Sequence, residues 1–320
     1  IIYMKTILVT GGAGFIGSNI VEYLLLNTNY NVKVIDNLIT GKIKNLEPFI
    51  NDKWKDRFEF VYGDICNLEK VRRVMKGLNM ITHQAALGSV PRSINDPLSS
   101  HKSNVNGFLN VLIAANEEGI KKIVYASSSS VYGDNNTLPK IENNIGQVLS
   151  PYAATKKIDE IYANVFTKCY GMQCIGLRYF NVFGPRQDPN GAYAAVIPKF
   201  INLMKNNKPP TINGDGKFSR DFTYVENVVQ ANLKALETKD DNCFGQVFNI
   251  GAGGRVSLNQ LVDILKKELK YKGEIIYGEN RAGDIPHSNA DITKAETYLS
   301  YDPKINFEKG IIKLLNYPTL

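Results

Sequence analysis

Tyr152 and Lys156 are the two side chains whose types and spacing best suit chemistry. They lie four residues apart in Ser-Pro-Tyr-Ala-Ala-Thr-Lys, downstream of a serine run from Ser127 to Ser130. Residues at positions i and i+4 share one face of a helix. An ammonium held beside a phenol favours the phenolate, and a phenolate can take a proton from an alcohol. An amphipathic helix that merely contains both residues is the alternative, so the pair needs support from the rest of the chain.

Composition indicates a globular protein that handles a small anionic molecule. The chain has 320 residues, of which 43% are hydrophobic and 22% charged, enough for one large or two coupled domains. The formal charge of +7 is spread thinly and forms no basic tract. Nucleic-acid binding is therefore disfavoured relative to binding of an anionic ligand.

Cysteine and histidine usage argues against disulfides and against a metal site. The four cysteines form no C-x-x-C pair and show no metal-ligand spacing, and the three histidines are scattered (Cys66, Cys169, Cys174, Cys243, His83, His101, His287). No run of 18 apolar residues and no basic-then-apolar leader occurs. We therefore expect a cytoplasmic protein that neither spans nor binds a membrane.

The first half of the chain alternates apolar runs with helical patterns, which is typical of a parallel sheet. Strands are predicted at Thr6–Thr10, Val32–Asp36, Phe58–Tyr62, Met80–Gln84, Ile123–Ser127 and Cys174–Arg178. Helices are predicted at Ile16–Leu26, Leu68–Lys76, Asn104–Glu117, Tyr152–Tyr170, Val196–Lys205, Asn227–Thr238 and Ser257–Lys270. This order predicts a Rossmann-type doubly wound α/β domain over residues 1–179, with a return segment near 220–250. Residues 180–320 are expected to form mainly a smaller mixed α/β domain that binds the substrate.

The segment from Val9 to Gly17, Val-Thr-Gly-Gly-Ala-Gly-Phe-Ile-Gly, predicts a dinucleotide-binding loop between a strand and a helix. Glycines at 11, 14 and 17 allow a tight turn and close approach of a pyrophosphate to the helix N-terminus. Asp36 ends the next strand, where a carboxylate can bind a ribose diol and repel a 2′-phosphate. This pattern favours NAD over NADP. Asp64 and Ile65 follow the third strand and are candidates for the adenine contact, with an ordinary turn aspartate as the alternative.

Several motifs together resemble the extended short-chain dehydrogenase/reductase family of nucleotide-sugar enzymes. These motifs are the glycine loop, the serines before Val131-Tyr132-Gly133, Tyr152-x-x-x-Lys156, and Arg-Tyr-Phe-Asn-Val-Phe-Gly at 178–184. The segments Ala86–Ser93 and Arg186–Pro198 are most similar to the UDP-N-acetylhexosamine 4-epimerase branch. The resemblance covers nearly the whole chain.

The resemblance implies a role for each site residue. Tyr152 is the catalytic base, Lys156 stabilises the phenolate and binds ribose, and Ser128 bonds the sugar O4. The other expected NAD contacts are Gly11, Gly14, Phe15, Ile16, Gly17, Asp36, Asn37, Asp64, Ile65, Gln84, Ala85 and Ala86. The expected UDP-sugar contacts are Gly88, Ser89, Ser128, Ser129, Ser130, Asn181, Gln187, Ala195, Val196, Arg220, Arg281 and Ser288. Arg220 and Arg281 are assigned to the diphosphate, for which a guanidinium is well shaped.

The serine run distinguishes among the reactions known for this fold. The related 4,6-dehydratases need an Asp-Glu pair where this chain has Ser129 and Ser130, and hydroxyls cannot replace carboxyl groups as acid and base near neutral pH. The resemblance therefore implies epimerisation at C4 through a 4-keto sugar, with NAD taking and returning hydride. A UDP-glucuronate 4-epimerase is one alternative, but that branch carries Thr and Tyr where this chain has Asn181 and Phe183. A non-catalytic NAD-binding sensor is the other.

Ser288 is expected to bound the C2 substituent of the sugar, because it matches the position that does so in the family. A small side chain there leaves room for an N-acetyl group. The resemblance thus implies interconversion of UDP-GlcNAc and UDP-GalNAc, with UDP-Glc and UDP-Gal also accepted. It also implies a homodimer formed through the helices near 104–117 and 152–170.

Overall fold

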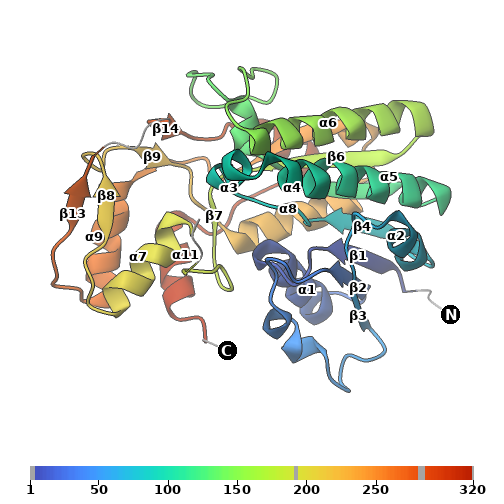
Figure 1. The fold of residues 1–320 in the computed structure, drawn as a ribbon, viewed down its shortest axis with the longest axis horizontal. Coiled ribbons are helices and arrows are strands. Elements are labelled where there is room, and N and C mark those ends of the chain that lie inside the picture. The colour runs from blue at the N-terminus through green and yellow to red at the C-terminus, as the bar shows by residue number, and fades with distance from the viewer. Residues whose placement is uncertain (1–3, 191–193, 280–284, 319–320) are drawn as a thin grey trace.

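The structure is a computed structural model that describes residues 4–190, 194–279 and 285–318. Its centre is a seven-stranded sheet in which every neighbouring pair of strands is parallel (Figure 1). The order across the sheet is β11-β6-β5-β4-β1-β2-β3. The strands are β1 (Thr6–Thr10), β2 (Asn31–Asp36), β3 (Phe58–Tyr62), β4 (Met80–His83), β5 (Lys122–Ser128), β6 (Gln173–Tyr179) and β11 (Gln246–Ile250). The predicted Rossmann-type α/β fold is confirmed.

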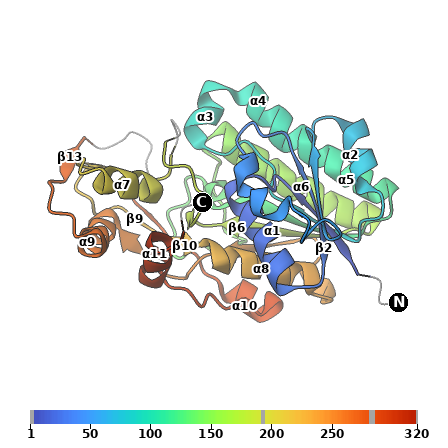
Figure 2. The same cartoon turned by 90° about the horizontal axis from the view of Figure 1, so that it is seen from below.

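Helices cover both faces of this sheet, and alternate residues of the strands point into two cores (Figure 2). Ile7 and Val9 face the core formed with α1 (Phe15–Asn27) and α8 (Val225–Glu237). Leu8 and Ile81 face the core formed with α2 (Leu68–Met75), α5 (Gly107–Glu117) and α6 (Pro151–Tyr170). Each fully buried Leu or Ile side chain stabilises such a core by about 1.5–3 kcal/mol. Both faces of the sheet are therefore packed against helices.

A second lobe lies beside the carboxyl ends of these strands and has its own core (Figure 1). Its helices are α7 (Val196–Lys205), α9 (Leu258–Leu269) and α11 (Phe307–Leu315). Its short strands are β8 (Thr211–Asn213), β9 (Ser219–Arg220), β12 (Val256–Ser257), β13 (Ile276–Gly278) and β14 (His287–Ser288). The parallel pair β7 (Val182–Phe183) and β10 (Thr223–Tyr224) joins the lobes, and α10 (Thr293–Leu299) packs on α8 and β11.

One predicted helix is longer and less regular than the sequence pattern indicated. The helix expected from Asn104 continues instead from α4 (Pro97–His101) through a π-helical turn, η3 (Lys102–Asn106), into α5. Asp96 begins α4 because its side chain accepts a bond from Ser99 N, and Pro97 occupies the first turn. A further short helix, α3 (Val90–Asn95), begins at Ser89 and was not predicted. None of the helices in the described part of the chain is long and apolar enough to cross a membrane.

Candidate active site

The glycine loop makes a turn that only glycine can occupy at two positions. Gly11 has a φ of +68°, and a Cβ there would lie 2.7 Å from the backbone of Ala85. A Cβ on Gly17 would lie 2.2 Å from the carbonyl oxygen of Gly11. The glycine loop therefore connects the end of β1 to the start of α1 in a short turn. The first N–H groups of α1 lack partners within the helix and lie at this loop.

Asp36 ends β2 with its carboxylate fixed beside this loop. Its Oδ2 accepts a hydrogen bond from Ala13 N at 3.0 Å and its Oδ1 accepts one from Leu38 N at 2.8 Å. Burial raises the pKa of this carboxyl, and the two N–H donors oppose that rise. Each oxygen keeps a free lone pair, so the group can still accept bonds from a diol.

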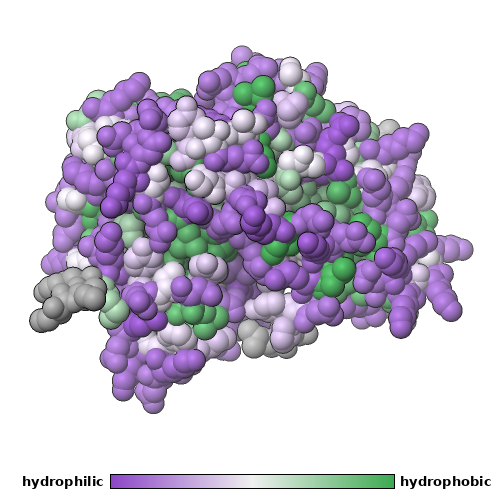
Figure 3. Space-filling view, turned by 180° about the vertical axis from the view of Figure 1, so that it is seen from behind, coloured by the Kyte–Doolittle hydropathy of each residue, from purple (hydrophilic) through white to green (hydrophobic). Residues whose placement is uncertain are grey.

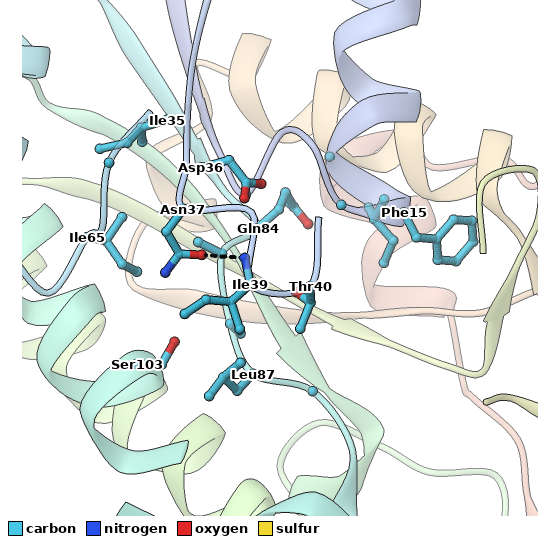
Figure 4. Close-up of a pocket in the computed structure, with 18 residues that line it drawn as sticks. Phe15, Ile35, Asp36, Asn37, Ile39, Thr40, Ile65, Gln84, Leu87 and Ser103 are labelled. Carbon is cyan, nitrogen blue, oxygen red and sulfur yellow. Dashed lines mark hydrogen bonds between the residues drawn. The ribbon is translucent and has the colours of Figure 1, made fainter. Parts of the chain in front are cut away.

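A cavity of about 290 Å³ runs along the glycine loop and past Asp36 (Figure 4). All of the predicted NAD contacts line it except Asp64, Tyr152 and Lys156. Ile35, Ile39, Thr40, Gly63, Leu87 and Ser103 line it too and were not predicted. Asp64 accepts a bond from Cys66 N at 2.8 Å, as a turn aspartate does, so its adenine contact stays a prediction.

Tyr152 and Lys156 meet Ser128 at a second cavity of about 410 Å³. Helix α6 begins at Ser150, whose hydroxyl accepts a bond from Ala153 N, and this places Tyr152 and Lys156 on its first two turns. Ser128 ends β5 and its hydroxyl accepts a bond from Ser130 N at 3.1 Å. The two cavities share Phe15, Ile16, Gln84, Ala86 and Gly88. The glycine loop, Asp36 and the Tyr–Lys pair thus surround one continuous region.

Gln84 lines both cavities, and its side chain is hydrogen-bonded to residues of the protein core. Its Nε2 donates to Thr82 Oγ1 at 2.9 Å and to Asn232 Oδ1 at 3.0 Å, and its Oε1 accepts from Tyr179 at 3.1 Å. These three hydrogen bonds fix the orientation of the Gln84 side chain where it lines both cavities.

Asn104 is a positioning residue that the sequence did not reveal. Its Oδ1 accepts from Leu87 N at 2.7 Å, and its Nδ2 donates to Leu87 O at 3.2 Å and to Thr155 Oγ1 at 3.0 Å. The π-helical turn directs this buried amide between the Leu87 segment and α6. Asn104 thereby connects a wall of the cofactor cavity to the helix that carries Tyr152.

The predicted substrate residues divide into two groups. Gly88, Ser89, Ser128 and Gln187 line the second cavity, and the Oε1 of Gln187 is buried without a protein partner among the described residues. Ser129, Ser130, Asn181, Ala195, Val196, Arg220 and Ser288 lie outside its lining. Ser288 and Arg220 are register partners in the pair β14–β9. Arg281 lies outside the described residues.

Comparison with known proteins gives the family. The profile of the NAD dependent epimerase/dehydratase family matches residues 7–251. A protein of Methanocaldococcus jannaschii, provisionally named a UDP-glucose 4-epimerase, is 42% identical over 313 residues, covering 97% of each chain. The chain belongs to this NAD-dependent family, and it is an enzyme of the UDP-sugar 4-epimerase type.

Two solved structures are similar over 98% of both chains, each at 38% identity. One is a UDP-glucose 4-epimerase of Thermotoga maritima with UDP-glucose, at a TM-score of 0.90. The other is a UDP-N-acetylglucosamine 4-epimerase of Methanobrevibacter ruminantium in complex with UDP-N-acetylmuramic acid, at a TM-score of 0.91. The predictions of an NAD cofactor and of the epimerase/dehydratase family are thus confirmed.

The residues present fit NAD. Side chains at Gly11 or Gly17 would collide with backbone, and the Asp36 carboxylate is available to a ribose. NAD supplies the hydride acceptor and donor that the Tyr–Lys pair lacks. Among the described residues, no group of three or more His, Cys, Asp or Glu side chains could hold a metal ion.

Proposed function

We propose that the protein epimerises UDP-hexoses at C4, and that UDP-GlcNAc and UDP-GalNAc are its main pair. The observation that carries this proposal is the second cavity, where Tyr152, Ser128 and Lys156 meet beside the cofactor cavity. No carboxylate is among the described residues that line it. This absence supports a reaction of proton and hydride transfer at one carbon without elimination of water.

Each residue has a role that its position supports. Tyr152 removes the proton from O4 as the base, and Ser128 hydrogen-bonds the same oxygen. Lys156 stabilises the phenolate of Tyr152 by its charge. Formation of the 4-keto sugar also requires loss of hydride from C4, which bound NAD would accept and later return. The sugar would turn within the cavity as the 4-keto form, and Tyr152 would give the proton back to O4 once hydride has been restored to the opposite face of C4. Proton and hydride both go back, so the reaction has no net redox change.

The choice of N-acetylated sugars rests on Ser288. Ser288 and Arg220, which the resemblance assigns to the diphosphate, are register partners on paired strands, and serine is a small residue at this position. Gln187, Ser89 and Gly88 offer hydrogen-bonding groups and open space at the second cavity. UDP-Glc and UDP-Gal are smaller at C2 and are accepted by the same site.

The proposal is tested by supplying UDP-GlcNAc, UDP-Glc and UDP-GlcA separately and following the 4-epimer by chromatography. We expect UDP-GalNAc from UDP-GlcNAc, and slower formation of UDP-Gal. Tyr152→Phe should reduce turnover by about 10²–10⁴-fold, because it removes the base. Faster turnover of UDP-GlcA would instead indicate a UDP-glucuronate 4-epimerase, and absence of any product despite bound NAD would indicate a sensor.

Ser288→Tyr tests the choice of substrate. A tyrosine should lower turnover of the N-acetylated pair at least tenfold and leave turnover of UDP-Glc within a few-fold, because the lost space is needed only by N-acetyl. Ser288→Ala is the matched control and should keep both activities. Equal losses on both sugar pairs would show that residue 288 does not bound C2.

A further inference from the structure

Lys156 forms a buried ion pair on the inner side of α6. Its Nζ lies 3.2 Å from Oδ2 of Asp159, and the two side chains are 2% and 1% exposed. The same Nζ donates to the carbonyl oxygen of Ala126 at 3.0 Å. Removing two charges from water costs several kcal/mol per ion, so a pair at such a depth needs good geometry to persist.

These two bonds fix the direction of the ammonium. A lysine ammonium has three N–H groups, and two of them point to Ala126 on β5 and Asp159 on α6. One N–H is left for the cavity that Lys156 lines together with Tyr152. Asp159 has a further notable property: its second oxygen, Oδ1, is buried without a partner among the described residues. Its carboxylate is thus committed to Lys156.

The other ionisable groups near the pair are neutral or already neutralised. Apart from Tyr152, the base itself, they are Lys157 and Glu160 on α6, His83 at the end of β4, Tyr125 on β5, and Cys174 and Arg178 on β6. Glu160 accepts two bonds from Arg178 at 2.8 and 2.9 Å, and Arg178 helps hold its pKa low. Lys157 Nζ lies 3.3 Å from Oε2 of Glu160, which also accepts one of the two Arg178 bonds, and Lys157 is partly exposed.

Burial decides the charge of the remaining groups. It lowers the pKa of His83 to about 3 and raises the pKa values of Tyr125 and Cys174, so all three are uncharged near pH 7. Burial also raises the pKa of Asp159 to about 7, against the opposing effect of Lys156, so this carboxylate is ionised at pH 8. Among the described residues beside Lys156, Asp159 is then the one negative charge that no cation other than Lys156 neutralises.

We propose that Asp159 is a positioning residue for Lys156: it holds the ammonium against the Ala126 carbonyl, and its charge limits how strongly Lys156 stabilises the phenolate of Tyr152. The proposal rests on the function proposed above, in which Tyr152 is the base. Asp159 touches neither sugar nor cofactor in this scheme. Its charge influences the pH at which Tyr152 loses its proton and can act as the base.

The first test is a pH titration of Tyr152. Asp159→Asn keeps the size and an oxygen acceptor for Lys156 but removes the negative charge. Ultraviolet phenolate absorbance is measured between pH 5 and 10 for Asp159→Asn and for wild type, each minus its Tyr152→Phe counterpart. We expect the ionisation midpoint to fall by about one pH unit, the order that one nearby charge contributes in a partly buried site. The acidic limb of kcat/KM should move by the same amount.

The matched control is Asp52→Asn, which makes the same charge change at an exposed position between Phe49 and Trp54, two residues of the core on the opposite face of the sheet from α6. It should leave the midpoint in place. An unmoved midpoint in Asp159→Asn, or an equal shift in Asp52→Asn, would overturn the proposal.

A second measurement tests the proposal even if a single variant is too unstable for the pH titration. Urea unfolding is compared for Lys156→Met, Asp159→Leu and the double variant. Each single change leaves one buried charge unpaired, so both should lower the urea midpoint, and the double variant should recover most of that loss. Additive losses would contradict the anchoring role. The phenolate titration and the urea unfolding use no UDP-sugar, so failure of the proposed reaction cannot be mistaken for failure of this proposal.

Discussion

At the scale of single residues, His83 shows how the end of the sheet fixes a protonation state. Thr10 Oγ1 accepts bonds from Gln84 N and Ala85 N at 3.2 and 3.3 Å, so its own proton is directed to His83 Nδ1 at 2.8 Å. The imidazole therefore carries its proton on Nε2, and that atom is buried without a partner among the described residues. Burial, with the nearby Lys156 charge, lowers the pKa of His83 to about 3.

This lowered pKa predicts a loss of stability in acid. An unfolded histidine binds a proton below about pH 6.5, whereas the folded one stays neutral down to about pH 3. The contribution of His83 to the free energy of unfolding is therefore complete above pH 6.5. It decreases by about 1.4 kcal/mol for each pH unit as the pH falls toward 3. His83→Asn should flatten the fall in unfolding free energy between pH 6.5 and 4, measured by urea titration.

The exposed His101 supplies the control for that experiment. His101→Asn makes the same substitution at a solvent-exposed imidazole and should keep the slope of the wild type. Identical slopes for the wild type and His83→Asn would disprove the buried neutral imidazole.

At the scale of elements, the run α4–η3–α5 depends on one amide. Without Asn104, the N–H and C=O of Leu87 and the hydroxyl of Thr155 each lose a partner. An unsatisfied buried polar group costs about 1–3 kcal/mol. The π-helical turn is the geometry that brings Asn104 inward while keeping the helix continuous on both sides.

Asn104→Ala is expected to lower the free energy of unfolding by about 2–4 kcal/mol, as several buried groups lose partners together. Asn106→Ala changes the same residue type within the same turn, but at an exposed position, and should cost less than about 1 kcal/mol. Thermal and urea unfolding measure both. A similar loss in the two variants would mean that the turn itself, and not the inward amide, is what matters.

The same elements show what the sequence could and could not predict. Strands β1 and β3 and helix α7 have the predicted bounds because their apolar runs end at glycine, proline or charged residues. Asp36 at the end of β2 and Tyr152 in the first turn of α6 each line one of the two cavities, and their roles in binding and catalysis stay predictions. Asn104 and Asp159 were missed. Their roles come from the tertiary contacts of their helices, which a local pattern of asparagine or aspartate does not contain.

At the scale of the whole molecule, exposed apolar side chains gather on α3, α4 and α6, which pack together. Ile94, Leu98, Ile161 and Val165 are 60%, 81%, 54% and 42% exposed. On the opposite side of the molecule, hydrophilic residues dominate and apolar ones form small separated patches (Figure 3). An apolar surface on one set of neighbouring helices favours association through that surface. We expect two chains to pair through it.

Ile161→Glu tests this expectation, because a charge buried at an apolar interface is costly. Light scattering should show a dimer for the wild type and a monomer for the variant. Ile312→Glu, on α11, is the control and should remain dimeric. A wild type that is monomeric at micromolar concentration would refute the predicted homodimer.

The position of β11 at the edge of the sheet has a consequence for folding of the chain during translation. Strand β6 is buried between β5 and β11, yet β11 follows it only after residue 245. A chain that has left the ribosome only as far as Tyr179 contains six of the seven strands and presents β6 as an open edge. The seven-stranded sheet therefore cannot be completed during synthesis before the first elements of the second lobe, α7, β8 and β9, have been translated. A nascent chain stalled near residue 180 should be sensitive to protease and prone to aggregate, and one extended past residue 250 should gain protection.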